Sequence, residues 1–458
     1  MKMKNNAILE FKVEKAIFNE LSFDEKKILP ILIKVCHIVA SIYKKQEYNH
    51  EKYPGASLYP YNVSDKEIQA AAKKNPAILS PFAVVEMNRH ELKVTPYHTK
   101  YASELQKISN LLLKASAISQ NKKFARYLKM AGQVLLSGNY KAMDLAWLTI
   151  KDSTLQFLIG PYERNLDTRF HLKMAYVAVV GIKDRVYTKK AERVRDVLLT
   201  TIGDVPKRQP SATKVKISTI RNIAYSGFFA QAHSSIKHIP QDDQTIKEAG
   251  SVLLGFLSTM DFKFDNLLYP IFNEIFETRF KKSYTQDLLR RANYYLMLVY
   301  GFSRQLHRYE NLKERLRELS PVINEINSMV SGIQSCKHLI MKGVINQKEL
   351  EAMIIMHICW GFAEWVFAKK SNIRNNYLRG EALALNFYFQ NAGLRELNGI
   401  SWPNFSKIFF IIENLSTILI RLLVEGSYAD ADRFIKKNLS YEIFKNFDSK
   451  LSKIGFHI

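Results

Sequence analysis

Cysteine is scarce in this chain, with three residues among 458. Cys36, Cys336 and Cys359 are too few and too scattered for a disulfide framework or a cysteine-rich metal site, so we expect buried, reduced thiols and a reducing compartment. The sequence also contains no Gly-x-Ser-x-Gly, Gly-x-Gly-x-x-Gly or phosphate-loop pattern. These absences remove the familiar sequence signatures of serine hydrolases and nucleotide-binding enzymes.

Long uninterrupted apolar runs are missing as well. The two most apolar segments, residues 353–368 and 408–424, contain ionisable side chains and fall short of a membrane span of about 20 residues, so we predict buried helices and no transmembrane segment. The N-terminal residues lead into an amphipathic pattern instead of the apolar block of a secretory signal. We therefore predict a cytoplasmic protein by default, although a protein secreted into another cell would have the same features.

Acidic residues are fewer than basic ones. The chain has 43 Asp and Glu and 67 Lys and Arg, which gives a formal net charge of +24. Such an excess favours acidic partners, anionic membrane surfaces or nucleic acid through long-range attraction. The basic residues are spread as short pairs over many predicted helices, with one concentrated stretch at residues 207–216. Since no nucleic-acid-binding module accompanies them, we do not predict specific nucleic-acid recognition, whereas an acidic partner stays open.

Helical periodicity dominates the apolar pattern. It predicts helices over residues 8–43, 101–117, 122–136, 140–149 and 189–200, and an almost wholly helical chain from residue 262 onward. The run Ser64-Asp-Lys-Glu67 is typical of a helix start. Strands are predicted over residues 82–87 and 91–95, joined by a hairpin turn at 88–90, and over residues 176–182 and 214–223.

These elements predict an α+β fold that is predominantly α, with a small sheet contributed by the middle third of the chain. Residues 206–213 are the best linker candidate, because they combine two prolines with Ser, Thr and charge and have no apolar period. The predicted organisation is a mostly helical N-terminal region with a short hairpin (1–205), a mixed segment with strands (206–261) and a helical lobe (262–458).

The segment at residues 295–306 is predicted to be a helix passing through a core. Zinc peptidases place two histidines four positions apart on one face of such a helix, with a glutamate beside the first as general base and a third ligand from another helix. The corresponding positions here read Tyr300-Gly301-Phe302-Ser303-Arg304. The helix therefore has the spacing of a zinc site without its imidazoles.

Seven short blocks follow one another in a particular order and spacing. They are Leu58-Tyr-Pro-Tyr-Asn-Val-Ser, Val94-Thr-Pro-Tyr-His, Asp144-Leu-Ala-Trp-Leu, Ile159-Gly-Pro-Tyr-Glu with Asp167 and Lys173, Ile239-Pro-Gln-Asp-Asp, Lys263-Phe-Asp with Pro270-Ile, and Leu339-Ile with Lys342-Gly-Val-Ile. Through these blocks, from about residue 56 to residue 434, the chain resembles the dipeptidyl peptidase III family, specifically its shorter bacterial and plant members. Some plant relatives of that family are fused to a Nudix domain, but no acidic Nudix box occurs here.

The resemblance implies a two-lobed clamp, in which a helical lobe carrying zinc faces a mixed lobe across a peptide-binding cleft. The family's metal motifs are His-Glu-x-x-His, or a version one residue longer, and a later Glu-Glu-x-x-Ala-Asp/Glu. The histidine ligands fall on Tyr300 and Arg304, or on Gln305 with the longer spacing, and the general base falls on Gly301. In the second motif only Glu325 survives, at the third ligand position.

These replacements predict that the chain binds no metal or other cofactor. A tyrosine hydroxyl with a reference pKa of about 10 is a poor zinc ligand, and a guanidinium has no lone pair to give. Glycine at position 301 also removes the group that would deprotonate the attacking water. We expect Arg304 to occupy the former metal position and to pair with Glu325, since an unpaired buried carboxylate is costly. Alternatively, both side chains reach solvent separately.

Other groups complete the predicted pocket. A family segment carrying a functional histidine falls on Tyr377, with Arg379 nearby. The stretch ending at Glu163 and residues 226–240 resemble segments near the family's substrate cleft, where a bound peptide would meet a strand edge. Both stretches are equally compatible with turns that determine the fold.

The histidines leave a further alternative open, namely a rearranged metal site that uses His307, Glu325 and either His338 or His357. A lone histidine in a helical core more often satisfies a neighbouring polar group. Cys359 has His357 close in sequence, but two residues spaced by two on one helix point to different sides, so a structural role is predicted for both.

The leading interpretation is thus a catalytically inactive relative of dipeptidyl peptidase III that holds a peptide, protein or small-molecule ligand between its lobes. The altered pocket would consist of Tyr300, Gly301, Arg304, Glu325, Tyr377, Arg379 and Glu163. Two alternatives remain. One is an enzyme that reuses the pocket for metal-independent chemistry, and the other is a basic interaction protein that binds acidic partners through its surface.

Overall fold

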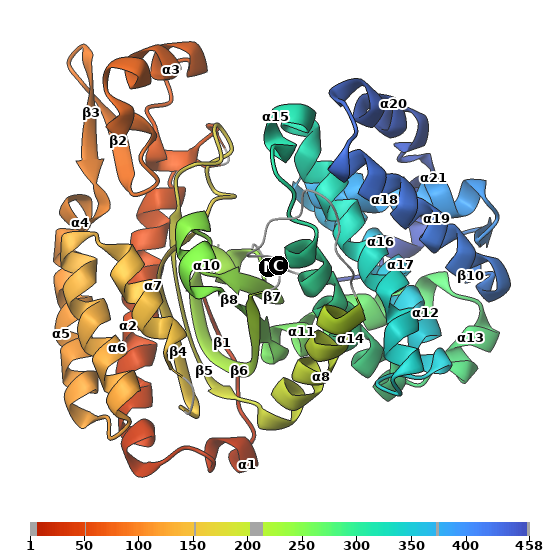
Figure 1. Cartoon of the computed structure of the whole chain (residues 1–458), viewed down its shortest axis with the longest axis horizontal. Coiled ribbons are helices and arrows are strands. Elements are labelled where there is room, and N and C mark those ends of the chain that lie inside the picture. The colour runs from red at the N-terminus through yellow and green to blue at the C-terminus, as the bar shows by residue number, and fades with distance from the viewer. Residues whose placement is uncertain (1–6, 51, 151–152, 202–213, 372–374, 456–458) are drawn as a thin grey trace.

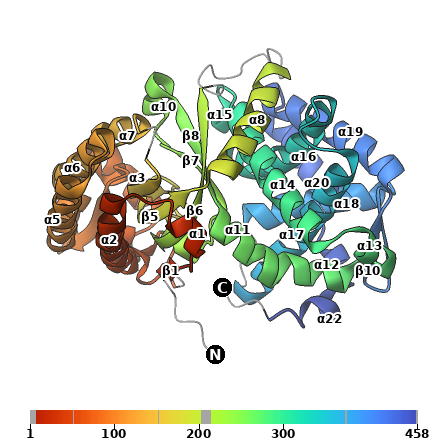
Figure 2. The ribbon, with the colours of Figure 1, turned by 90° about the horizontal axis from the view of Figure 1, so that it is seen from below.

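A six-stranded sheet stands between two masses of helices in the computed structural model, which describes residues 7–50, 52–150, 153–201, 214–371 and 375–455 (Figures 1 and 2). The strands follow the order β4-β5-β6-β8-β7, and β1 pairs with β6. All pairs are antiparallel except β6 with β8. The strands are β1 (Ile8–Glu10), β4 (Leu155–Glu163), β5 (Ala175–Lys183), β6 (Val215–Gly227), β7 (Ile236–Ile239) and β8 (Ser251–Phe256).

The N-terminal helices cover one face of this sheet (Figure 1). The long helix α2 contacts β5 and β6, and α5 packs on both α2 and α6. The predicted hairpin is confirmed as β2 and β3, and the predicted helix start at Ser64 is confirmed as a capping box with Glu67. The elements are α1 (Lys15–Phe18), α2 (Phe23–Glu47), a 3₁₀ turn (Ala56–Leu58), α3 (Asp65–Lys74), a second 3₁₀ turn (Pro76–Leu79), β2 (Ala83–Asn88), β3 (Glu91–Pro96), α4 (Tyr97–Lys100), α5 (Ala102–Ile118), α6 (Lys122–Ser137) and α7 (Tyr140–Leu148).

The prediction of a continuous helix over residues 8–43 is wrong at its start. Residues 8–10 form β1, which pairs with residues 224–226 of β6. The run Ile-Leu-Glu is too short to carry either period, and pairing with a distant strand decides its conformation. The helix proper begins only at Phe23, after Ser22 caps it through Glu25.

The second helical mass packs on the other face of the sheet (Figure 2). Its elements, with those that connect the strands, are α8 (Arg185–Thr201), α9 (Phe228–Gln231), α10 (Asp243–Ala249), α11 (Leu257–Lys263), a π-helical turn (Phe264–Leu268), α12 (Tyr269–Ile275), α13 (Thr278–Ser283), α14 (Gln286–Leu306), α15 (Leu312–Leu316), a 3₁₀ turn (Arg317–Leu319), α16 (Ser320–Met341), α17 (Gln347–Ser371), α18 (Asn376–Gln390), β9 (Leu394–Leu397), β10 (Ile400–Pro403), α19 (Phe405–Val424), α20 (Tyr428–Asn438), α21 (Glu442–Lys445) and α22 (Asp448–Leu451). The small hairpin β9–β10 was not predicted from the sequence.

Strand β8 shows how one sheet serves two cores. Val252, Leu254 and Phe256 belong to the core under the N-terminal helices, whereas Leu253 belongs to the core of the helical lobe. Because successive side chains of a strand point to opposite faces, a fully buried strand needs apolar residues at every position. The sheet therefore contributes to both hydrophobic cores. Side chains on one face pack with the N-terminal helices, and side chains on the other face pack with the helical lobe.

The segment around α17 tests the prediction of buried helices. A 23-residue stretch, Gln347–Lys369, is long and apolar enough to cross a membrane, contrary to the expectation from its length, but 83% of its most apolar window is buried inside the protein. Such burial is typical of a core helix in a globular protein. All three cysteines are buried free thiols, as predicted. The predicted linker at residues 206–213 lies outside the described residues, and the predicted domain boundaries stay a prediction.

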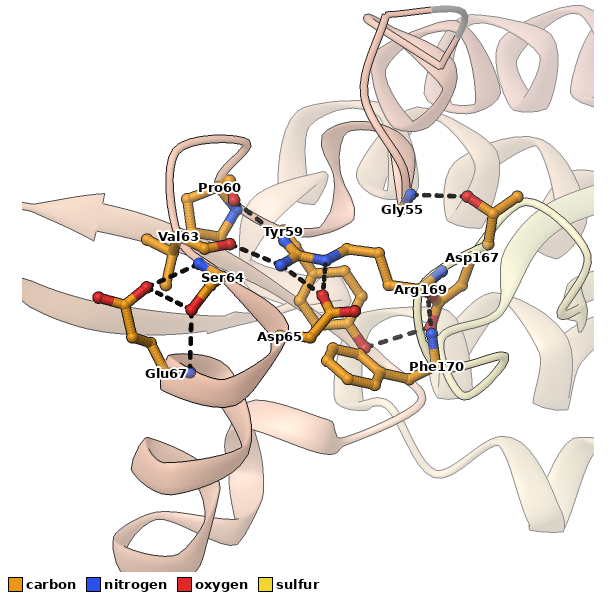
Figure 3. A network of polar contacts seen from close by, with 11 residues as sticks. Gly55, Tyr59, Pro60, Val63, Ser64, Asp65, Glu67, Asp167, Arg169 and Phe170 are labelled. Carbon is orange, nitrogen blue, oxygen red and sulfur yellow. Dashed lines mark hydrogen bonds and ion pairs between the residues drawn. The ribbon is translucent and has the colours of Figure 1, made fainter. Parts of the chain in front are cut away.

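Two of the blocks that carried the resemblance meet at Asp167 (Figure 3). The fully buried carboxylate of Asp167 accepts hydrogen bonds from the hydroxyl of Tyr59 at 3.2 Å and from four backbone N–H groups within residues 169–173. The ammonium group of Lys173, also fully buried, donates to the carbonyl oxygens of Ile78, Ser80 and Ala83. Each of these buried polar groups thus has hydrogen-bond partners within the protein. Asp167 and Lys173 therefore have a structural role in this loop.

Arg169 ties the same loop to the start of α3 (Figure 3). Its Nε donates to Asp65 at 2.7 Å, its Nη1 to the carbonyl of Pro60 at 3.1 Å and its Nη2 to the carbonyl of Val63 at 2.5 Å. Only 6% of this side chain is exposed. All three nitrogens of the guanidinium are therefore engaged within the protein.

Candidate functional site

The helix with the replaced motif, α14, places two of the predicted residues on one face. Tyr300 and Arg304 are four positions apart, and both contact Glu325 of α16. The hydroxyl of Tyr300 donates to Glu325 Oε1 at 2.7 Å, and Arg304 Nη1 donates to Glu325 Oε2 at 2.5 Å and to the Tyr300 oxygen at 2.9 Å. The predicted pair of Arg304 with Glu325 is confirmed, and the alternative of two separate solvent-exposed side chains is wrong. The geometry also selects Arg304 over the buried Gln305.

Two glycines bring the helices of this triad close together. A Cβ atom at Gly332 on α16 would lie 2.8 Å from the carbonyl oxygen of Val299, and one at Gly380 on α18 would lie 3.2 Å from the backbone nitrogen of Ile326. Larger residues at either position would force the helix backbones apart. The close packing of α14, α16 and α18 therefore fixes how Tyr300 meets Glu325.

At Gly301, where the resemblance places the general base, neighbouring side chains fill the space that a glutamate would need. A Cβ atom at Gly301 would lie 2.9 Å from a methyl group of Leu253 on β8 and 3.0 Å from one of Ile236 on β7. Nε2 of His238, also on β7, donates to the carbonyl oxygen of Gly301 at 2.8 Å. Helix α14 consequently packs directly on the shared sheet at this point, and a glutamate side chain here would have to displace both aliphatic groups.

Arg304 differs from its neighbours in exposure. Some 47% of its side chain is exposed, whereas 10% of the Glu325 side chain is exposed. A guanidinium carries five N–H donors, and the two bonds of Nη1 account for two of them. Within the described part of the chain, Nε and Nη2 have no hydrogen-bond partner. Three donors of a half-exposed cation that is held at Nη1 therefore remain available.

Glu163 and a residue that sequence reasoning missed, Lys237, form a second ion pair close by. Lys237 Nζ on β7 lies 2.5 Å from the buried Glu163 Oε2 at the end of β4. Since β4 and β7 are the two ends of the strand order, this bond joins opposite ends of a curled sheet. Despite burial, the charge of Glu163 raises the pKa of Lys237, so it is a cation at pH 7.

Tyr377 lies on α18, and the charges of both ion pairs act on its hydroxyl. Burial raises its pKa, followed by the charge of Glu325, while Lys237 and Arg304 oppose this effect. The hydroxyl is thus protonated at pH 7, and it has no hydrogen-bond partner in the described ranges. Arg379 lies two positions further along α18, where a side chain points to another side of the helix. Among the described residues no hydrogen bond or ion pair joins either Tyr377 or Arg379 to the triad, so their place in the pocket stays a prediction.

A second group of ionisable side chains, which the sequence did not indicate, consists of Glu364, Lys263, Glu381 and His357. Burial raises the pKa of Glu364 and lowers that of Lys263, and each charge offsets part of the effect on the other. Burial likewise raises the pKa of Glu381 well above its usual range and lowers that of His357 to about 3. Nδ1 of His357 and Oε2 of Glu381 lie 3.3 Å apart, as a close approach of two neutral groups instead of an ion pair.

The residues do not fit a zinc ion. A phenol and a guanidinium stand at the histidine positions, and the guanidinium is bonded to the one carboxylate that remains. Nδ1 of His307 lies 2.9 Å from the carbonyl oxygen of Ser303, and His357 contacts Glu381 instead of Glu325. Among the described residues, no three His, Cys, Asp or Glu side chains are grouped so that they could hold a metal ion. The rearranged site suggested by the histidines is thus not formed there.

The two stretches predicted to border a cleft contain glycines that the fold requires, and their place beside a cleft stays a prediction. Gly160 and Gly227 adopt positive φ values of 153° and 74°, and a Cβ atom at Gly227 would lie 2.0 Å from the carbonyl oxygen of Tyr176, so both glycines are required by the fold. Within the described part of the chain, however, strand β7 ends the sheet with one edge unpaired. Since Phe256 N donates to Ser235 O, the alternation of an antiparallel pair turns the backbone groups of Ile236 and His238 toward that edge.

Comparisons with known proteins agree with the observed architecture. No family model matches the chain. The chain is similar to a curated protein named Nudix hydrolase 3 from Arabidopsis thaliana, with 23% identity over 363 residues that cover 76% of this chain and 46% of that protein. The chain thus spans about half the length of this curated relative.

Two solved structures match nearly the whole chain. Dipeptidyl peptidase III from Caldithrix abyssi aligns with a TM-score of 0.85 and 20% identity, covering 97% of this chain and 95% of the other. Dipeptidyl peptidase III from Corallococcus sp. strain EGB aligns with a TM-score of 0.81 and 19% identity, covering 97% and 92%. At these identities the likeness concerns the fold, and it confirms the predicted two-lobed architecture of a helical lobe and a mixed lobe.

Proposed function

We propose that this chain, which has the dipeptidyl peptidase III fold, is a catalytically inactive form that binds a peptide or protein segment between its lobes. The observation that carries this proposal is the bond from Arg304 Nη1 to Glu325 at 2.5 Å. A permanent cation there supplies the positive charge that a metal ion would bring, and it satisfies the surviving carboxylate. The former metal position has thus become an internal ion pair.

The loss of hydrolysis follows from two separate features. First, zinc would need neutral imidazole or thiolate donors, and the side chains at these positions are Tyr300 and Arg304. Second, no carboxylate stands where an attacking water would be deprotonated, because Leu253 and Ile236 fill the space beside Gly301. Restoring the metal would therefore not restore the reaction.

The open edge of β7 supports the binding part of the proposal. An extended peptide can add a strand to an exposed sheet edge, with backbone hydrogen bonds giving affinity. Ile236 and His238 present backbone donors and acceptors there, next to the helix that carries Tyr300 and Arg304. A ligand paired with β7 would lie beside the altered site.

The alternative of metal-independent chemistry has weaker support. Burial, followed by the charge of Glu325, raises the pKa of Tyr300 well above its usual range. The protonated hydroxyl donates a hydrogen bond to Glu325. A general acid or base is most effective when its pKa is near the working pH. Tyr300 is thus placed to hold Glu325, instead of exchanging protons with a substrate.

The test combines metal analysis with a substrate screen. We expect elemental analysis of the purified protein to find no stoichiometric zinc, and a panel of dipeptidyl arylamides to give no turnover with or without added zinc. The double variant Tyr300→His with Arg304→His should gain zinc, since both positions face Glu325, but it should remain inactive because Gly301 is unchanged. Zinc in the wild-type protein together with peptide hydrolysis at an ordinary enzymatic rate would refute the proposal.

A control separates cleft binding from binding through the basic surface. If a peptide binds along β7, its affinity should fall in an Arg304→Gln variant and change only moderately with salt. Binding that falls steeply with salt and ignores Arg304→Gln would favour the surface alternative, which depends on the net charge of +24.

A further inference from the structure

The free donors of Arg304 define what chemistry the altered site can recognise. Nη1 is committed to Tyr300 and Glu325, and both oxygens of Glu325 are occupied by these partners. The guanidinium is therefore fixed along one edge, while Nε and Nη2 remain as a pair of parallel donors. Such a pair matches the two oxygens of a carboxylate, and little side-chain entropy is lost on binding because Arg304 is already held.

The same guanidinium lies beside the unpaired edge of the sheet. The charge of Arg304 acts on two neighbouring residues of β7: burial, then Arg308 and Arg304, lowers the pKa of His238, and at Lys237 burial and Arg304 oppose the rise in pKa that Glu163 causes. Helix α14 also touches β7 directly, because Nε2 of His238 donates to the carbonyl oxygen of Gly301, one turn before Arg304. A group at the end of a peptide backbone along β7 would therefore come near Arg304.

Two ion pairs that are each neutral overall stand beside the site, and the charge of Arg308 also acts on His238. The pairs Arg304–Glu325 and Lys237–Glu163 each combine one cation with one carboxylate. Lys237 is 17% exposed and Arg304 is 47% exposed, so the cation that solvent reaches most is Arg304. An additional anion would find free donors at Arg304 and the unpartnered hydroxyl of Tyr377 in the same neighbourhood.

We propose that Arg304 binds the free C-terminal carboxylate of a peptide whose backbone pairs with β7, with Nε and Nη2 as the donors. This inference rests on the proposed peptide-binding function and adds the identity of the recognised group. A C-terminal carboxylate lies on the backbone axis of the added strand, whereas side-chain carboxylates stand perpendicular to it. The ligand class is accordingly peptides with a free C-terminus, such as the products of a peptidase.

The experiment compares two probes on the full-length protein. N-acetyl-tetra-alanine with a free C-terminus and its C-terminal amide differ only in the carboxylate. With arginine labelled with ¹⁵N, the Nε–H resonance of Arg304 is assigned by its loss in an Arg304→Lys variant. We expect the acid to shift this resonance and to bind about tenfold or more tightly than the amide, as a lost charge-assisted bidentate contact implies.

Variants test whether the effect belongs to Arg304. Arg304→Gln should reduce binding of the acid to the level of the amide. Arg421→Gln removes the same charge at a site that is 80% exposed and pairs with an exposed glutamate, so it should bind the acid like the wild type. Thermal unfolding of each variant checks that it is folded, and the comparison of acid with amide on the wild type needs no variant.

The outcomes separate this inference from the function on which it rests. Equal binding of acid and amide, unaffected by Arg304→Gln, would overturn the carboxylate inference and leave peptide binding standing. Inorganic phosphate that displaces the acid at a similar concentration would also overturn it, since the site would then accept any anion. If neither peptide binds at millimolar concentration, the peptide-binding function fails together with the inference.

Discussion

Arg169 in the mixed lobe and Arg304 in the helical lobe each pair with a carboxylate, but their remaining donors are used differently. All three nitrogens of Arg169 are bonded to Asp65 and to the backbone carbonyls of Pro60 and Val63, and 6% of the side chain is exposed. Arg304 uses one nitrogen, leaves two without a partner in the described chain and is 47% exposed.

This difference separates a residue that holds the fold from a residue available to a ligand. Buried polar groups in folded proteins have their partners within the protein, and the network around Asp167 and Arg169 follows that rule. At the altered site, one bond from Arg304 Nη1 and one from the Tyr300 hydroxyl satisfy Glu325, so the remaining donors of Arg304 are not needed for stability. The two networks should therefore respond to mutation in different ways.

The largest expected effect is at the centre of the saturated network. Asp167→Ala removes the acceptor of four backbone N–H groups and the Tyr59 hydroxyl, and we expect a loss of about 5 kcal/mol in the free energy of unfolding. Urea unfolding followed by circular dichroism measures this loss. A loss below about 1 kcal/mol would mean that water replaces these bonds and that the contrast between the networks is false.

A second prediction tests the filled space at the altered site. Gly301→Glu would place a carboxylate among Leu253 and Ile236, and we expect it to lower the free energy of unfolding by about 3 kcal/mol or more. Gly255→Ala is the matched control, since its Cβ atom would have ordinary contacts no closer than 3.6 Å. A stable Gly301→Glu protein would show that the general-base position is open after all.

The direct comparison of the two arginines comes next. Arg169→Gln should cost about 3 kcal/mol of stability, because it leaves buried carbonyl groups unpaired, whereas Arg304→Gln should cost about 1 kcal/mol or less. Parallel urea titrations of the two variants give the difference. Equal losses would indicate that Arg304 serves the fold as much as Arg169 does, and the assignment of its free donors to a ligand would lose its basis.

The smallest expected effect is a pH dependence in the saturated network. Burial lowers the pKa of Lys173 to about 8, although Asp167 opposes this shift. Between that value and the unfolded-state pKa of about 10.4 the unfolded chain binds more protons, so this group makes the protein more stable as pH rises through that window. We expect the advantage of the wild type over Lys173→Met to grow by about 2 kcal/mol from pH 7.5 to pH 9.5. An advantage that shrinks over this interval would contradict the lowered pKa.

The sequence allowed the chemistry at the replaced motif to be predicted more fully than the surroundings of the site. The pair of Arg304 with Glu325 followed from the cost of burying one carboxylate alone, and the hairpin at residues 83–96 followed from alternation and turn residues. Lys237 was missed because it stands in a four-residue strand without a motif, and its partner Glu163 is 74 positions away.

The sequence pattern also could not predict which side chains occupy the space beside Gly301. Glycine indicated that a glutamate was absent, but only the packing of α14 on the sheet shows Leu253 and Ile236 in its place. Strands β7 and β8 are short, and their apolar residues face two different cores, so neither strict alternation nor a helical period identified them. Tertiary contacts between distant segments decide these features.

The pairing of β1 with β6 has a consequence for synthesis on the ribosome. Ile8, Leu9 and Glu10 emerge early, yet their partners are Ser226, Tyr225 and Ala224. The helices up to α7 can pack on one another while β1 is still unpaired. The sheet can be completed only after β8 has left the exit tunnel. We expect the nascent chain to expose an apolar edge during that interval, so that chaperone contacts at the ribosome become part of making this protein.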